Sequence, residues 1–81
     1  MKVRVKFFAI LRERAGSAEI AKDIAEGSTV ADLWRALQKD YPKLDVPGIR
    51  LLYAVNQNYV SADQPLQEND EVVFVPPVSG G

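Results

Sequence analysis

Residues 29–41 read TVADLWRALQKDY and predict the main helix of this protein. Thr29 suits the N-cap, because its hydroxyl can accept a hydrogen bond from the backbone N–H three residues on, and Asp32 can reach back to the cap. Pro42 ends the helix. Apolar side chains recur along it at the spacing of one helical face. We therefore expect a single helix whose apolar face packs against a core, the members of that face being Val30, Leu33, Trp34, Leu37 and Tyr41.

The segments on both sides of this helix have the pattern of β-strands. Residues 2–8 alternate, with Val3, Val5 and Phe7 on one face and basic side chains on the other. Further strands are expected at residues 18–24, 49–55, 59–60 and 71–75. The connections between them are a helical turn or loop at 9–14, an irregular segment at 43–49, a hairpin turn at 56–58, one helical turn at 62–66 and a turn at 68–70.

The resulting β-β-α-β-β-β order predicts an α+β fold of the β-grasp (ubiquitin-like) type, with a mixed five-stranded sheet and one main helix packed on one face. In this topology the last strand lies parallel to the first, near the sheet centre. Val72 and Phe74 point to one face of that strand, and Val73 and Val75 point to the other. The sequence leaves open which pair is buried, and one pair is expected to stay exposed unless a partner covers it.

Length and composition fit one domain, residues 1–75, followed by an extended tail, residues 76–81. The chain has 81 residues, of which 47% are hydrophobic and 26% are charged, as in ordinary soluble globular proteins. It contains no continuous apolar run of about 18 residues, and residues 1–6 alternate charged and apolar side chains, unlike a secretory signal. We expect a cytoplasmic protein without a membrane partner.

The charged residues argue against nucleic acid as a partner, since ten Lys and Arg against eleven Asp and Glu give a net charge of −1. Residues 1–50 carry all ten basic side chains and seven acidic ones, whereas residues 51–81 carry four acidic ones and no basic one. Two interpretations are open: these charges simply solvate the surface, or the acidic third steers the protein toward a basic partner.

Two residue types are absent from the sequence, and their absence excludes most enzyme chemistry. The chain has no Cys and no His. It therefore lacks a thiolate nucleophile, a disulfide framework and the commonest general base and metal ligand. No metal site is expected.

The last six residues are the most unusual part of the chain. Proline has no backbone N–H and a fixed φ, so the two prolines end the last strand at Val75 and direct the chain outward. Six extended residues reach roughly 20 Å. Glycines without a Cβ can enter a narrow channel. The alternative is an ordinary frayed terminus. The segment in question is Pro76-Pro77-Val78-Ser79-Gly80-Gly81.

With these motifs the sequence resembles the small subunits of molybdopterin synthase, the MoaD family of ubiquitin-like sulfur carriers. The resemblance spans nearly the whole chain, and the closing Pro-Pro-Val-Ser-Gly-Gly is its strongest part. Two features depart from the family: Val75 stands where an aromatic residue is common, and Asn56-Gln57-Asn58 stands where Asn-Gly is often found. The other matching segments are Phe7-Phe8-Ala9, Arg12-Glu13, Val55-Asn56-Gln57, Pro65-Leu66 and Asp70-Glu71-Val72.

The resemblance implies that the reactive group is the C-terminus itself. An activating enzyme would use ATP to adenylate the Gly81 carboxylate, and a sulfur donor protein would then displace AMP and leave a thiocarboxylate. The loaded tail would insert into the synthase large subunit and give its sulfur to cyclic pyranopterin monophosphate. The chain itself would bind no cofactor and offer no catalytic side chain.

The resemblance also assigns partner-binding roles. Four tail residues would contact the channel of the large subunit that receives the tail: Pro76, Pro77, Val78 and Ser79. Gly80, which has no Cβ, would keep the chain narrow next to Gly81. A docking surface would include Phe8, Val73, Val75 and the acidic residues near Asp70.

Three other functions remain open at this point. The same Gly-Gly end would suit a protein modifier that forms isopeptide bonds with lysines. A sulfur carrier for thiamine synthesis or tRNA thiolation is a related possibility, although the Pro-Pro-Val-Ser spacing favours the molybdopterin branch. The last is a β-grasp interaction module with an inert tail.

Overall fold

The computed structural model describes residues 1–45 and 50–76. Within these ranges the secondary structure follows the predicted order, and a short helix is present at the position where a helical turn or loop was expected. The elements are β1 (Lys2–Phe7), α1 (Ile10–Ala15), β2 (Glu19–Asp23), α2 (Val30–Asp40), the 3-10 helix η1 (Pro42–Leu44), β3 (Leu52–Val55), β4 (Asn58–Val60) and β5 (Glu71–Val75).

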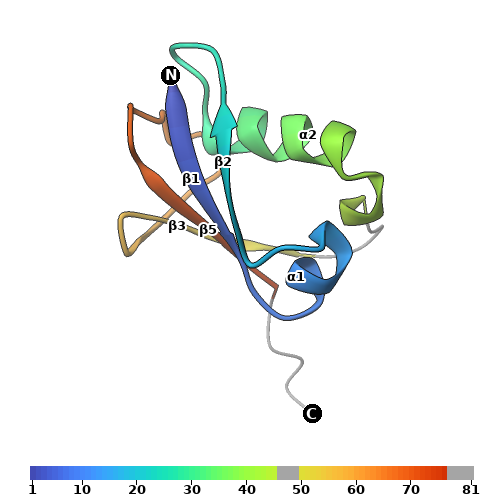
Figure 1. The fold of residues 1–81 in the computed structure, drawn as a ribbon. Helices are drawn as coiled ribbons and strands as arrows, with labels where there is room; N and C mark the ends of the chain where they lie inside the picture. Colours follow the sequence, from blue (N-terminus) through green and yellow to red (C-terminus); the bar gives the residue numbers. More distant parts are fainter. Residues whose placement is uncertain (46–49, 77–81) are drawn as a thin grey trace.

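The strands form one mixed sheet in the order β2-β1-β5-β3-β4. The central strand β5 pairs in parallel with β1 and antiparallel with β3. Helix α2 covers one face of this sheet, and α1 lies beside the end at which β5 finishes (Figure 1). The predicted β-grasp architecture is confirmed, including the position of the last strand beside the first.

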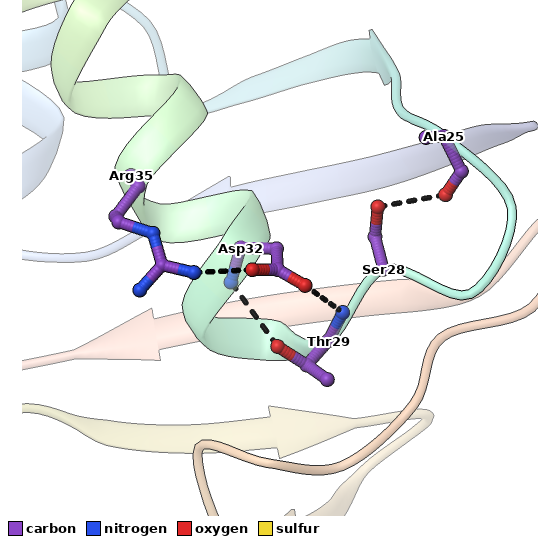
Figure 2. A network of polar contacts seen from close by, with 5 residues as sticks. All are labelled: Ala25, Ser28, Thr29, Asp32 and Arg35. Carbon is purple, nitrogen blue, oxygen red and sulfur yellow. Dashed lines mark hydrogen bonds and ion pairs between the residues drawn. The ribbon is translucent and has the colours of Figure 1, made fainter.

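Helix α2 begins with the capping box that the sequence predicted (Figure 2). The Asp32 N–H donates to the Thr29 hydroxyl at 3.2 Å, and the Thr29 N–H donates to the Asp32 carboxylate at 3.0 Å. Arg35 pairs with the other carboxylate oxygen. The pKa of Asp32 is lowered, chiefly because the Thr29 backbone N–H donates to its ionised form, with help from the Thr29 side chain and Arg35.

The core lies between α2 and the face of β5 that carries Val72 and Phe74, both fully buried. This settles which pair of β5 faces inward. The Phe74 ring is surrounded by other aromatic rings, and its centroid lies 4.8 Å from that of Trp34. The centroids of Tyr53 and Phe7 lie 5.9 and 6.5 Å away. The central strand is therefore fixed by side-chain packing as well as by hydrogen bonds to both neighbours.

Residues 62–66 do not form the predicted helical turn. The Gln64 N–H donates to the Ser61 carbonyl in a simple turn, and Pro65 bridges to Thr29. The reason is the start of α2, whose first backbone N–H groups have no partner within the helix. Val30 and Ala31 donate to carbonyls of this segment at 3.0 and 2.9 Å, which keeps it extended along the helix end.

The strand predicted at 49–55 is shorter than expected. Strand β3 begins at Leu52, whose side chain is half exposed, so one face of this strand is open. The start expected at Ile49, together with the rest of 46–49, lies outside the described residues. The hairpin after β3 turns at Asn56 and Gln57, both with positive φ.

No helix in the described ranges is both long enough and apolar enough to span a lipid bilayer.

Candidate functional site: the root of the C-terminal tail

The predicted tail starts from the central strand of the sheet. Val75 ends β5, and Pro76 follows it as the last described residue, partly buried. The remaining predicted tail residues lie outside the described part of the chain, and they are Pro77, Val78, Ser79, Gly80 and Gly81. Because β5 is paired on both sides, the tail starts from a strand held by two ladders.

A row of apolar side chains crosses the open face of the sheet where the tail begins. Val75 lies in register with Leu52 of β3. On the other side the register of β1 with β5 ends at Phe7 and Phe74; Phe8 directly follows Phe7, and Val75 directly follows Phe74. Phe8 is 49% exposed, Leu52 is 50% exposed and Val75 is partly buried. We call Phe8, Val75 and Leu52 the tail-root row.

A second row lies one step further from the tail. Val73 is in register with Lys6 on one side and Ala54 on the other, and Ala54 faces Tyr59 of β4. Val73 is only 8% exposed, although it is on the open face and outside the main core cluster. It therefore forms the floor of this surface, while Tyr59, 74% exposed, stands at its edge.

The apolar surface continues into a hollow of about 370 Å³ at the β3–β4 edge. Leu52 and Tyr59 line it and belong to the exposed surface, but neither was singled out from the sequence. Their outward direction depends on the register of β3 with β5, and alternation alone does not supply that register. The hollow is lined by Leu51, Leu52, Tyr53, Tyr59, Val60 and Ser61.

The predicted acidic part of the docking surface lies at the other end of β5. The Asp70 carboxylate accepts hydrogen bonds from the Asn56 side chain at 2.9 Å and from the Gln67 N–H at 2.8 Å, so it stabilises the turn before β5. Glu71 lies 3.4 Å from Lys6 and 3.7 Å from Arg4. The carboxylates of Asp70 and Glu71 therefore make hydrogen bonds and ion pairs within the domain, at the end of β5 away from the tail root.

The described residues contain no group of three or more His, Cys, Asp and Glu that could hold a metal ion. What they place at the tail root is an apolar surface next to Pro76, the last described residue. Such a surface suits the docking of a protein that receives the tail.

Comparison with known families agrees with this arrangement. Residues 5–81, which include the whole tail, match the model of the ThiS family. This chain belongs to the ThiS family.

This ThiS-family chain is similar to an Escherichia coli protein named molybdopterin synthase sulfur carrier subunit. The two are 45% identical over 83 residues, which cover 98% of this chain and 99% of the relative. The resemblance to the molybdopterin synthase small subunits is thereby confirmed.

Two solved structures share the fold. The putative molybdopterin converting factor subunit 1 of Pyrococcus furiosus is 36% identical, with a TM-score of 0.84 over 96% of this chain and 99% of that one. SAMP1, the small archaeal modifier protein 1 of Haloferax volcanii, is 28% identical, with a TM-score of 0.89 over the full length of both chains. The likeness confirms the ubiquitin-like β-grasp fold.

Proposed function

We propose that this chain is the sulfur carrier subunit of a molybdopterin synthase and that the Gly81 carboxylate is its reactive group. The observation that carries the proposal is the closing Pro-Pro-Val-Ser-Gly-Gly segment, which follows directly on the central strand beside an exposed apolar surface. The name of the Escherichia coli relative, which matches over nearly the whole of both chains, supports it.

The chemistry takes place on the terminal carboxylate and uses groups that other proteins supply. A carboxylate is a poor electrophile, so an activating enzyme joins it to the α-phosphate of ATP and releases pyrophosphate. Sulfide-level sulfur from a donor protein then attacks the acyl carbon, the bond to AMP breaks, and Gly81 ends in a thiocarboxylate. In the large subunit this sulfur is transferred to cyclic pyranopterin monophosphate. Two rounds complete the dithiolene, and each time water supplies the oxygen that regenerates the carboxylate.

The contribution of the domain is positioning. In this proposal the large subunit docks on the tail-root row, and Pro76 to Gly80 then lie along its channel. Holding the sulfur at a fixed place converts a bimolecular encounter into an intramolecular step, an effect that can be worth several kcal/mol of the barrier. This role agrees with a chain that has neither Cys nor His. In this proposal the reaction takes place in the cytoplasm.

Deleting Gly81 tests the proposal. The variant is expected to keep its fold, because the described core contains no residue beyond β5, and to lose sulfur loading and molybdopterin formation completely. Circular dichroism reports the fold, and mass spectrometry after incubation with the activating enzyme, ATP and a sulfur source reports replacement of one oxygen by sulfur. A matched variant, Ser79→Ala, keeps the chain length and should still be loaded. Molybdopterin synthesis by the truncated protein would refute the assignment.

A second candidate is a protein modifier, which the likeness to SAMP1 of Haloferax volcanii favours. It uses the same acyl-adenylate but transfers the chain itself to a lysine amine. Stable lysine conjugates in a cell lysate would support this function, whereas a terminal thiocarboxylate without conjugates would support sulfur transfer. If this chain restores thiamine synthesis or tRNA thiolation, but not molybdopterin synthesis, in cells that lack their own sulfur carrier, it serves another sulfur pathway.

A further inference from the structure

The backbone turns sharply at Ala9, between β1 and α1. Ala9 has φ 54° and ψ −131°. The Leu11 N–H donates to the Phe8 carbonyl at 3.1 Å, so Phe8 to Leu11 form a β-turn with Ala9 at its second position. These angles are those of a type II′ turn, a position that normally takes glycine because a Cβ makes it costly for an L-residue.

The strain persists because the chain is held on both sides of the turn. Phe7, before it, is 1% exposed, and its N–H donates to the Ala18 carbonyl at 2.9 Å. Leu11, after it, is fully buried. With both flanks anchored in the core, Ala9 has no room to relax to a negative φ without moving one of them.

The strained turn carries two exposed apolar side chains. Phe8 is 49% exposed and Ile10 is 40% exposed, whereas Phe7 before them and Leu11 after them are buried. Phe8 belongs to the tail-root row: it follows Phe7, which is in register with Phe74, the residue before Val75. Backbone strain of this kind tends to be kept where it serves a site.

We propose that Ala9 is a positioning residue for docking: the buried flanks impose a positive φ, and within that region the Ala9 Cβ leaves the turn fewer backbone angles than glycine would have, which holds the Phe8 ring in one orientation at the tail root. Glycine at this position would relieve the strain and also admit other backbone angles. Phe8 would then have to be ordered when the partner binds, and that ordering weakens association. This inference rests on the proposed function, since the partner is the synthase large subunit.

Three proteins test it. Ala9→Gly removes the Cβ. A second protein is assembled by chemical ligation with D-alanine at position 9. D-alanine keeps a methyl group, but a positive φ lies in its favoured backbone region. Ala25→Gly is the matched control, because Ala25 is exposed, lies outside the helices and strands, and is absent from the residues with positive φ. Each is measured for thermal midpoint and for affinity to the large subunit from the same organism.

We expect Ala9→Gly to raise the thermal midpoint and yet to weaken binding roughly three- to tenfold, the cost of immobilising one large side chain. The D-alanine protein should be more stable than wild type and bind as tightly. Ala25→Gly should bind normally. Nuclear Overhauser contacts between the Phe8 ring and the Val75 methyl groups should weaken in Ala9→Gly alone. A purely structural role would change stability without changing affinity.

Phe8→Ala separates failure of this inference from failure of the function. If Phe8→Ala weakens binding while Ala9→Gly binds like wild type, the positioning role is refuted and the docking surface stands. If Phe8→Ala also binds like wild type, the proposed docking surface itself is wrong. Equal weakening by the glycine and D-alanine proteins would likewise overturn the positioning role.

Discussion

Replacing Phe74 by alanine should remove a large part of the stability of this domain. The side chain is fully buried in the central strand, with three aromatic rings around it. Truncation of a buried Phe costs about 3–5 kcal/mol, and aromatic pairs add about 0.5–1.5 kcal/mol beyond burial. An 81-residue protein unfolds with about 4–12 kcal/mol in total. We therefore expect Phe74→Ala to lower the free energy of unfolding by about 4–5 kcal/mol, near the upper end of the range for a buried Phe, and to leave the protein partly unfolded at 37 °C.

Urea denaturation measures this loss through the fluorescence of Trp34, the single tryptophan, which packs on Phe74. Circular dichroism provides a second probe that does not depend on that contact. The matched control is Val75→Ala, the next residue, on the open face. It should cost about 1 kcal/mol or less and weaken partner binding instead. A loss below about 2 kcal/mol for Phe74→Ala would refute the view that this ring fixes the central strand.

Two further predictions concern local backbone and charge. The pKa of Asp32 is lowered in the folded state. The ionised carboxylate therefore stabilises the fold above the unfolded-state pKa of about 3.9, and this stabilisation disappears as the pH falls through the lowered folded-state pKa. The difference in urea midpoint between wild type and Asp32→Asn should shrink on acidification, and a constant difference would contradict this. Gln57→Gly should stabilise the β3–β4 hairpin by about 0.5–1 kcal/mol, because φ is 72° at Gln57 and glycine carries no Cβ penalty there. Thermal denaturation checks this, and a lower midpoint would contradict it.

Much of the fold was predictable because its signals are local. The capping box needs only Thr29 and Asp32 at the correct spacing, and the apolar face of α2 follows from helical periodicity. The order of the elements then limits the topology to a few arrangements, which is why the parallel pairing of β1 and β5 could be predicted. The tail stands out for a similar reason, since the prolines and terminal glycines restrict the backbone by their own covalent structure.

Predictions failed where a segment depends on a distant partner. Residues 62–66 look helical in isolation, but they supply carbonyl groups to the free N–H groups at the start of α2, more than 30 residues away in sequence. The positive φ at Ala9 has the same origin, because buried residues on both sides impose it. Nothing in the residue type alone predicts a strained alanine.

The sequence by itself determined the strands, the capped helix and the proline-rich end, since each depends on residues close together in the chain. Only the tertiary structure decided which side of β5 is covered. Alternation assigns Val72 and Val73 to opposite faces, but both are valine, and the choice depends on which face meets the apolar side of α2. The same packing leaves Leu52 and Tyr59 on the open face with Val75, because the register of β3 with β5 and with β4, and not sequence distance, decides which side chains share a face.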